Sequence, residues 1–222
     1  NSRSASYYSW MWKRAKGYFD VVAYKGDTNA GRTVAHSLGV APEMMWVKCR
    51  TDTTSWMVYH SALTAYKYLV LNSGAGPVTH NGNWYNTSPT DSVFTVGDGA
   101  TNVAQTQVAY LFATLAGISK VGSYSGNAAN NHVINCGFSA GARFVLIKRS
   151  DGAGDWFLFD SVRGITSTSN DGILHLNDTN IQRTEAYEIG ADAIQPHASG
   201  FKLTSNNTIN HGEMEYIFYA IA

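Results

Sequence analysis

The residues of this sequence best suited to hold a ligand lie in one loop. Trp84 and Tyr85 stand in the stretch THNGNWYNTSPT, directly after His80 and Asn83. Aromatic rings stack on the apolar faces of sugars, while amide and imidazole groups bond the sugar hydroxyls. These four residues are therefore the predicted ligand-binding site. The alternative is a loop that folds its tryptophan into its own core.

The sequence contains no convincing catalytic or metal-binding motif. The seven His residues show neither the HxH nor the HxxxH spacing of a metal pair, and the two Cys residues form no CxxC. The sequence therefore predicts a protein with no catalytic residues, no metal and no cofactor, and we expect that it is not an enzyme.

Two groups of carboxylates leave other chemistry open. Asp151 and Asp155, in SDGAGD, could bind Ca²⁺ through a glycine-rich turn, although a solvated hairpin turn explains them as well. Glu185, Glu188 and Asp192 gather in TEAYEIGAD and could serve glycoside hydrolysis if their separation suited it. The sequence does not define that separation.

Composition excludes several classes of partner. Sixteen basic and sixteen acidic residues cancel, so nothing predicts attraction to nucleic acid. No apolar run reaches the roughly 18 residues that cross a bilayer, so we expect no membrane insertion. Charged residues make up only 14% of the chain, and Ser, Thr, Asn and Gly supply the polar surface, as in virion-surface and carbohydrate-facing proteins. Cys49 and Cys136 are too few for a disulfide framework and are expected to be buried free thiols.

The elements that must position these residues are duplicated. VVAYKG returns a hundred residues later as VGSYSG, and SWMVYHS returns as DWFLFDS, which places Trp56 opposite Trp156. The heptapeptides YLFATLA (110–116) and YIFYAIA (216–222) close the two copies. We expect the two tryptophans to be core anchors, with a duplicated ligand platform as the alternative.

The duplicated blocks predict strands, because they are short, rich in Val, Ile, Phe, Tyr and Trp, and bounded by turn residues. Blocks such as MMWV and WFLF do not alternate with polar residues, so both faces of these strands need cover. The other half, a neighbouring subunit or long loops could supply it. The predicted fold is therefore all-β, with two duplicated antiparallel β-sandwich-like units packed together, within a homo-oligomer for which a trimer is favoured.

The predicted boundaries follow the repeat. Residues 17–116 form the first β repeat and residues 117–222 the second. Residues 1–16 are expected to be a linker and the closing strand of a preceding unit, because Trp10–Arg14 aligns with the first closing block. On this interpretation the chain is the C-terminal part of a longer polypeptide.

Several blocks resemble a known family. These are KRAKGYFDVV, CGFSAGARFVLIKR, DWFLFD and the final YIFYAIA. They are similar to an uncharacterised C-terminal domain family of tail-fibre-like and proposed receptor-binding proteins of tailed bacteriophages, often linked to laminin-G or concanavalin-like modules. The resemblance covers nearly the whole chain from Met11 and implies a β-structured module on the virion surface. It carries no established catalytic or binding residues.

Three functions follow as expectations. The first is a non-enzymatic adhesion module on the tail fibre or tail tip, contacting other virion proteins and binding host cell-surface polysaccharide. The second is a purely structural virion protein, in a fibre shaft or as a head decoration. The third is a polysaccharide-degrading tailspike. Glycan binding separates the first from the second, and release of reducing ends would favour the third.

Overall fold

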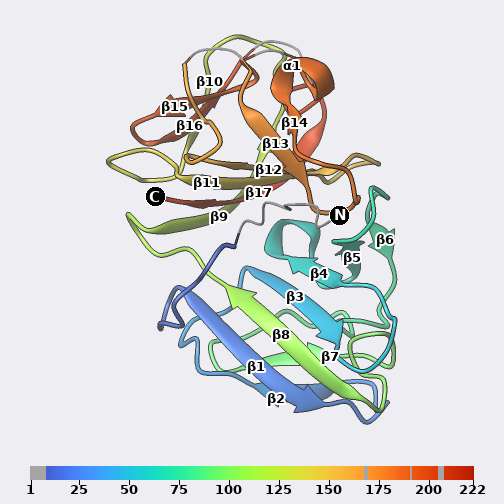
Figure 1. Cartoon of the computed structure of the whole chain (residues 1–222). Coiled ribbons are helices and arrows are strands. Elements are labelled where there is room, and N and C mark those ends of the chain that lie inside the picture. The colour runs from blue at the N-terminus through green and yellow to red at the C-terminus, as the bar shows by residue number, and fades with distance from the viewer. Residues whose placement is uncertain (1–8, 168–169, 191, 205–207) are drawn as a thin grey trace, which may run out of the picture.

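The molecule is built almost entirely of antiparallel strands, arranged as two sandwiches one above the other (Figure 1). This computed structural model describes residues 9–167, 170–190, 192–204 and 208–222. We call β1 to β8 the first unit and β9 to β17 the second unit. The predicted all-β fold of two packed, duplicated sandwich-like units is confirmed.

The first unit pairs a large sheet with a small one. The large sheet has the order β1-β8-β3-β4-β5-β6, and the small sheet pairs β2 with β7. The strands are β1 (Phe19–Lys25), β2 (Arg32–Ala35), β3 (Met44–Cys49), β4 (Met57–His60), β5 (Lys67–Val70), β6 (Val78–Thr79), β7 (Val93–Val96) and β8 (Thr106–Phe112). A short 3-10 helix, η1 (Ser61–Leu63), follows β4.

The second unit repeats this topology. Its large sheet has the order β14-β13-β12-β11-β17-β9, and its small sheet the order β10-β16-β15. The elements are β9 (Ser119–Ser125), β10 (His132–Asn135), β11 (Phe144–Arg149), β12 (Trp156–Asp160), β13 (Gly172–His175), β14 (Arg183–Thr184), α1 (Glu185–Glu188), β15 (Ile194–His197), β16 (Gly200–Leu203) and β17 (Glu215–Ile221). Only β15 and α1 lack a first-unit counterpart among the described residues. Both described helices are far too short to cross a bilayer.

The predicted equivalence of Trp56 and Trp156 is confirmed by matching hydrogen bonds. The backbone nitrogen of Trp56 donates to Asn72 Oδ1 at 2.9 Å, and that of Trp156 donates to Asn177 Oδ1 at 2.7 Å. Each tryptophan carbonyl also accepts from the residue just before its partner asparagine. The two copies therefore share the local geometry that starts β4 and β12.

The closing strands are equivalent, but not in the register that their sequences suggest. Phe112 lies opposite Met44 on β3, whereas Ile221 lies opposite Phe144 on β11, so equivalent residues are 109 positions apart. The heptapeptides match at a separation of 106. Because the difference is an odd number, the sequence match pairs residues that point to opposite faces of the sheet.

Three hydrophobic cores explain why the strands do not alternate. One face of each large sheet packs on the small sheet of its own unit, around Trp84 and Phe94 in the first unit and around Phe201 and Phe218 in the second. The other faces of the two large sheets meet in a third core that includes Tyr219. The second face of each large sheet is therefore covered by the other half of the chain, one of the three possibilities that the sequence left open.

The segment before β1 enters this shared core. Residues 9–14 form no strand, although the repeat predicts one at Trp10–Arg14. The ring of Trp12 instead packs edge-on against Trp46 of β3 and Phe144 of β11. Burial between two units replaces strand pairing here, because no described strand lies alongside this segment to accept its backbone hydrogen bonds. Cys49 and Cys136, as expected, are buried free thiols.

Candidate functional site

Trp84, the centre of the predicted ligand loop, is a core residue. Its side chain is 0% exposed and packs edge-on against Tyr59, with ring centroids 5.8 Å apart. The prediction that Trp84 stacks on a ligand is wrong, because no face of the ring reaches solvent. The loop places the indole beneath β4, where it fills the first unit's own core.

The three other predicted loop residues do not converge on one surface. Asn83 is buried, and its backbone oxygen accepts from Thr101 Oγ1 at 2.7 Å. His80 is exposed, and its Nδ1 accepts from the backbone nitrogen of Gly82 at 2.9 Å. Tyr85 is 47% exposed. The sequence pattern marks a tightly bonded turn, and of the four predicted residues only His80 and Tyr85 are exposed.

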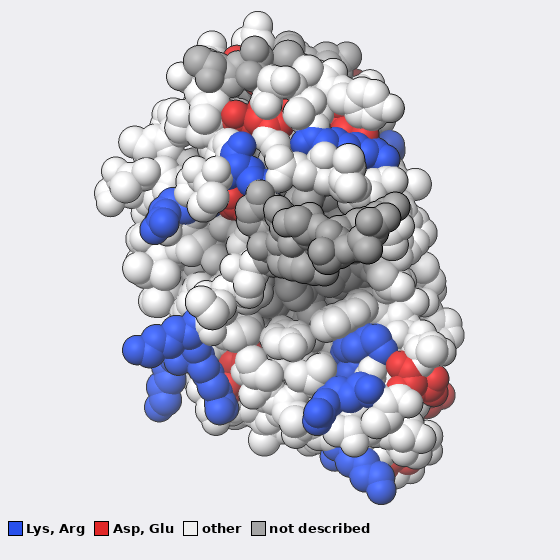
Figure 2. Space-filling view, in the orientation of Figure 1, with Lys and Arg blue, Asp and Glu red and all other residues white. Residues whose placement is uncertain are grey.

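The structure instead gathers aromatic rings between the two units. A cleft of about 540 Å³ opens there. On the face shown in Figure 2, the charged side chains lie on the upper and lower halves of the molecule, and the atoms between them that are not grey are uncharged. The large sheets of both units and the segment before β1 supply its walls, which consist of Trp10, Trp12, Trp46, Trp56, Leu71, Tyr110, Phe112, Phe144, Leu158 and Leu176. Every lining side chain is aromatic or leucine, so the cleft favours ligands with apolar faces.

The aromatic walls are braced by ring contacts. Trp46 packs on Phe112 with centroids 4.7 Å apart, and Trp12 stands edge-on to both rings. Trp56 stacks on Tyr110 at 6.0 Å with an interplanar angle of 23°. Since Trp10, Trp12, Trp56 and Tyr110 are all only half-buried, part of this aromatic surface faces the cleft.

The two equivalent tryptophans have different roles at this boundary. Trp156 is 1% exposed, and its indole nitrogen donates to the backbone oxygen of Val70 across the units at 3.0 Å. Lys148 reinforces the contact, with Nζ bonded to the oxygens of Gly74 and Gly154. Trp56 lines the cleft instead. Trp156 is therefore buried in the contact between the units, whereas the equivalent Trp56 faces the open cleft.

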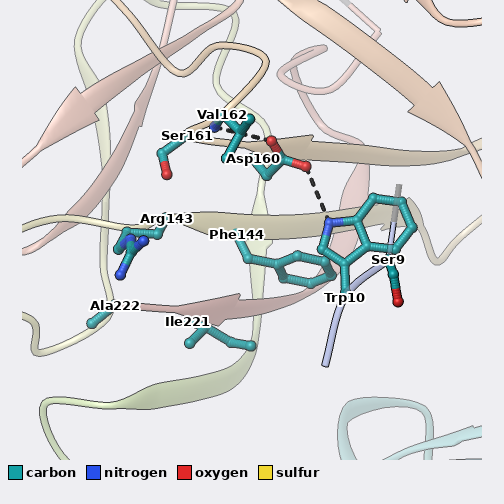
Figure 3. A pocket seen from close by; sticks show the side chains of 9 residues that line it. All are labelled: Ser9, Trp10, Arg143, Phe144, Asp160, Ser161, Val162, Ile221 and Ala222. Atoms are coloured by element: carbon teal, nitrogen blue, oxygen red, sulfur yellow. Dashed lines mark hydrogen bonds between the residues drawn. The ribbon is translucent and has the colours of Figure 1, made fainter. Parts of the chain in front are cut away.

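A smaller pocket of about 270 Å³ shares Trp10 and Phe144 with the cleft (Figure 3). The indole nitrogen of Trp10 donates to Asp160 Oδ2 at 3.1 Å, which fixes the ring at the pocket wall. Arg143, which is exposed, and Ser161 line the opposite side of the pocket. Hydrogen-bond donors thus stand beside the aromatic cleft.

The second-unit carboxylates are committed to local contacts. Glu185 is fully buried, and its Oε1 accepts from the backbone nitrogen of Ile194 at 3.0 Å. Burial raises the pKa of the Glu185 carboxyl to about 7. Glu188 pairs with Arg183 beside it. A buried acid next to an ion pair does not present two carboxylates to a substrate, so this geometry gives no support to glycoside hydrolysis.

The turn at Asp151 and Asp155 is also satisfied internally. Asp151 Oδ1 accepts from Arg149 Nε at 2.7 Å, and Asp155 Oδ1 accepts from Asn177 Nδ2 at 2.7 Å. Across the described ranges, no group of three or more His, Cys, Asp or Glu side chains is arranged to hold a metal ion. The hairpin-turn alternative agrees with these contacts.

An all-β protein of two duplicated sandwiches that meet across an aromatic cleft is the class that this fold and site define. The chain belongs to the family described as a domain of unknown function (DUF7483), whose model matches residues 1–222. No curated protein and no solved structure matches the chain. The relation to phage tail proteins stays a prediction.

Proposed function

We propose that this chain is a non-enzymatic adhesion module of a phage virion surface and that it binds host cell-surface glycan in the cleft between its units. The observation that carries the proposal is the set of half-buried indoles, Trp10, Trp12 and Trp56, on the cleft walls. Such rings offer flat apolar faces that stack on sugar C–H groups without needing a charged partner.

The adjoining pocket supports a sugar over a purely apolar ligand. A sugar needs hydrogen-bond partners for its hydroxyls as well as a stacking surface. Arg143 and Ser161 provide such groups in the pocket that shares Trp10 with the cleft. A sugar ring stacked on the indoles would thus extend its hydroxyls toward Arg143 and Ser161. The tail-fibre or tail-tip location, the contacts with other virion proteins and the trimeric assembly belong to the same proposal and rest on the sequence resemblance.

The duplication provides a matched pair for the test. Trp56→Ala removes a wall of the cleft, and we expect it to weaken glycan binding about tenfold, the value of one good aromatic contact. Trp156→Phe alters the interface at the equivalent position, which does not line the cleft, and should leave glycan binding unchanged. Binding is measured on an array of host polysaccharide fragments, with melting curves for each variant.

The alternative functions predict different results. A purely structural virion protein is favoured by the many contacts that Trp12 makes inside the shared core, since an aromatic interface needs no ligand. If wild-type protein binds no host glycan, that alternative replaces the proposal. Equal loss of binding in Trp56→Ala and Trp156→Phe would also overturn the cleft as the site. Release of reducing ends from host polysaccharide would instead support the polysaccharide-degrading function.

A further inference from the structure

A second concave site lies at the edge of the second unit's sandwich, away from the cleft. It is a groove of about 460 Å³ between β9, the edge strand of the large sheet, and β10, the edge strand of the small sheet. The ring of Phe218, on neighbouring β17, also lines it. Because β9 and β10 belong to different sheets and do not pair, the space between them is open to side chains or ligands.

The equivalent edge of the first unit is bridged. Asp20 on β1 is 1% exposed, and its Oδ2 accepts from the backbone nitrogen of Ser37, just beyond β2, at 2.7 Å. Arg32 on β2 lies over the ring of Tyr24 on β1, with its guanidinium carbon 5.9 Å from the ring centroid. Two side-chain contacts thus link the sheets where the second unit has its groove.

Three differences in sequence open the second unit's edge. Lys120 stands in the place of Asp20 and cannot accept a hydrogen bond from the small sheet. Gly122 stands in the place of Val22, and the Phe218 ring lies so close to it that an added Cβ would be only 2.7 Å away. His132 replaces Arg32. The second unit has therefore lost the hydrogen bond that Asp20 accepts, and a ring contact between His132 and Tyr124, with centroids 5.8 Å apart, takes the place of the Arg32 contact.

The groove offers a defined set of polar groups. His132 Nδ1 lies 2.8 Å from Asn210 Oδ1. Because that oxygen can only accept, Nδ1 carries the proton, which leaves Nε2 as an acceptor. Asn135 Oδ1 accepts from the nitrogen of Gly137 at 2.8 Å, so its Nδ2 supplies donors. Lys120 is the single charged side chain among the lining residues. An acceptor, a neutral donor and one cation thus line the groove, above the Phe218 ring, which is only 3% exposed.

We propose that the groove between β9 and β10 binds one sugar ring that carries a carboxylate. The apolar face of the sugar packs over Gly122 and the 40% exposed side chain of Val133, its hydroxyls bond His132 and Asn135, and its carboxylate pairs with Lys120. Apolar surfaces with a few placed polar groups are typical of small-molecule sites, and a lysine ammonium is a compact partner for an anion. This inference shares the ligand class of the proposed function but uses none of the cleft residues.

First-unit residues provide the test, because they are known to fit this scaffold. Lys120→Asp and His132→Arg each restore the residue found at the bridged edge. The control is Lys202→Asp, which removes a positive charge from β16, outside the groove lining. Backbone amide chemical shifts are followed by NMR while glucuronate, galacturonate and N-acetylneuraminate are added, with glucose and galactose as neutral probes.

We expect an acidic sugar to shift the amides of Gly122 and Asn135. Affinity should fall at least about fivefold in Lys120→Asp, and the shifts should vanish in His132→Arg. Lys202→Asp should behave as wild type. The proposal would be overturned if none of the three acidic sugars shifted these amides, or if Lys202→Asp lost as much affinity as Lys120→Asp. Neutral sugars that bind as tightly as acidic sugars would overturn the pairing of a carboxylate with Lys120. The two sites are tested separately. Wild-type protein that binds no glycan on the array but still shows the groove shifts would refute only the cleft, and Trp56→Ala should weaken array binding while leaving the groove shifts unchanged.

Discussion

The indole nitrogen of Trp156 lies 3.0 Å from the backbone oxygen of Val70, so a duplicated residue donates a hydrogen bond from the second unit to the first. Trp156→Phe should lower the free energy of unfolding by about 2 kcal/mol, because a buried carbonyl loses its donor and the smaller ring leaves space. Urea unfolding followed by circular dichroism measures the change. Trp56→Phe, whose indole lines the cleft, should change stability by less than half as much. Equal losses would show that the hydrogen bond contributes nothing.

Trp84 should behave as a structural residue. Trp84→Ala removes a fully buried indole, and we expect a loss of about 3–5 kcal/mol, enough to unfold the first unit in many conditions. Tyr85→Ala, one residue away and half-exposed, should cost less than about 1 kcal/mol. Melting temperatures of the two variants provide the comparison. A Trp84→Ala protein that melts like wild type would refute the burial of this ring.

The side chains of Asn102 and Asn210 should both be essential for the stability of their units. Each side chain accepts from the chain just after β1 or β9 and donates to a carbonyl two residues further on. Asn102→Asp replaces the donating NH₂ by an oxygen, which leaves the carbonyls of Asn29 and Gly97 facing a carboxylate. We expect a loss of about 2–4 kcal/mol on chemical unfolding. Asn86→Asp, at an exposed position, is the matched control and should be nearly neutral.

Glu185 should make stability depend on pH. The pKa of the Glu185 carboxyl is raised from 4.5 to about 7, chiefly by burial. Between pH about 4.5 and about 7, the folded protein therefore keeps a proton that the unfolded chain has lost. Stability contributed by this group therefore falls as the pH rises through that window, by up to about 3 kcal/mol. Glu185→Gln should raise the melting temperature above pH about 7 and leave it unchanged near pH 4.

The control for this effect is Glu188→Gln, which removes a negative charge from the same helix. Its ion pair with Arg183 is lost, so its melting temperature should not rise at high pH. A rise in both variants would assign the effect to net charge rather than to the buried carboxyl.

Strands and duplication could be predicted from the sequence because they depend on local composition and on spacing. The equivalence of Trp56 and Trp156 follows from a constant displacement, and the matching bonds to Asn72 and Asn177 confirm it. The register of the closing strands could not be predicted. Both faces of these strands are buried, so apolar residues do not alternate with polar ones. The sequence therefore does not show which side chains point to which core.

The loop at Trp84 illustrates a second limit. A tryptophan among turn formers can stack on a ligand or fill the core of its own unit, and the full burial of the Trp84 ring against Tyr59 shows that it fills the core. The cleft could not be predicted from the sequence either. Trp10 and Trp12 lie far from Trp56 in the chain, and the repeat assigns them to a closing strand and Trp56 to a core. A difference between the repeats was the available signal: the groove residues Lys120 and Gly122 depart from Asp20 and Val22.

The identical strand orders of the two large sheets have a consequence for how the chain reaches its native state. β8 lies between β1 and β3, and β17 lies between β9 and β11, so each closing strand fits a slot of the same shape in either unit. Both strands bury apolar side chains on both faces, and neither carries a buried charged side chain that would exclude it from the wrong slot. During refolding, exchange of β8 and β17 competes with correct closure, as in other tandem repeats. We therefore expect a slow refolding phase whose amplitude falls when the second unit is unfolded and refolded alone.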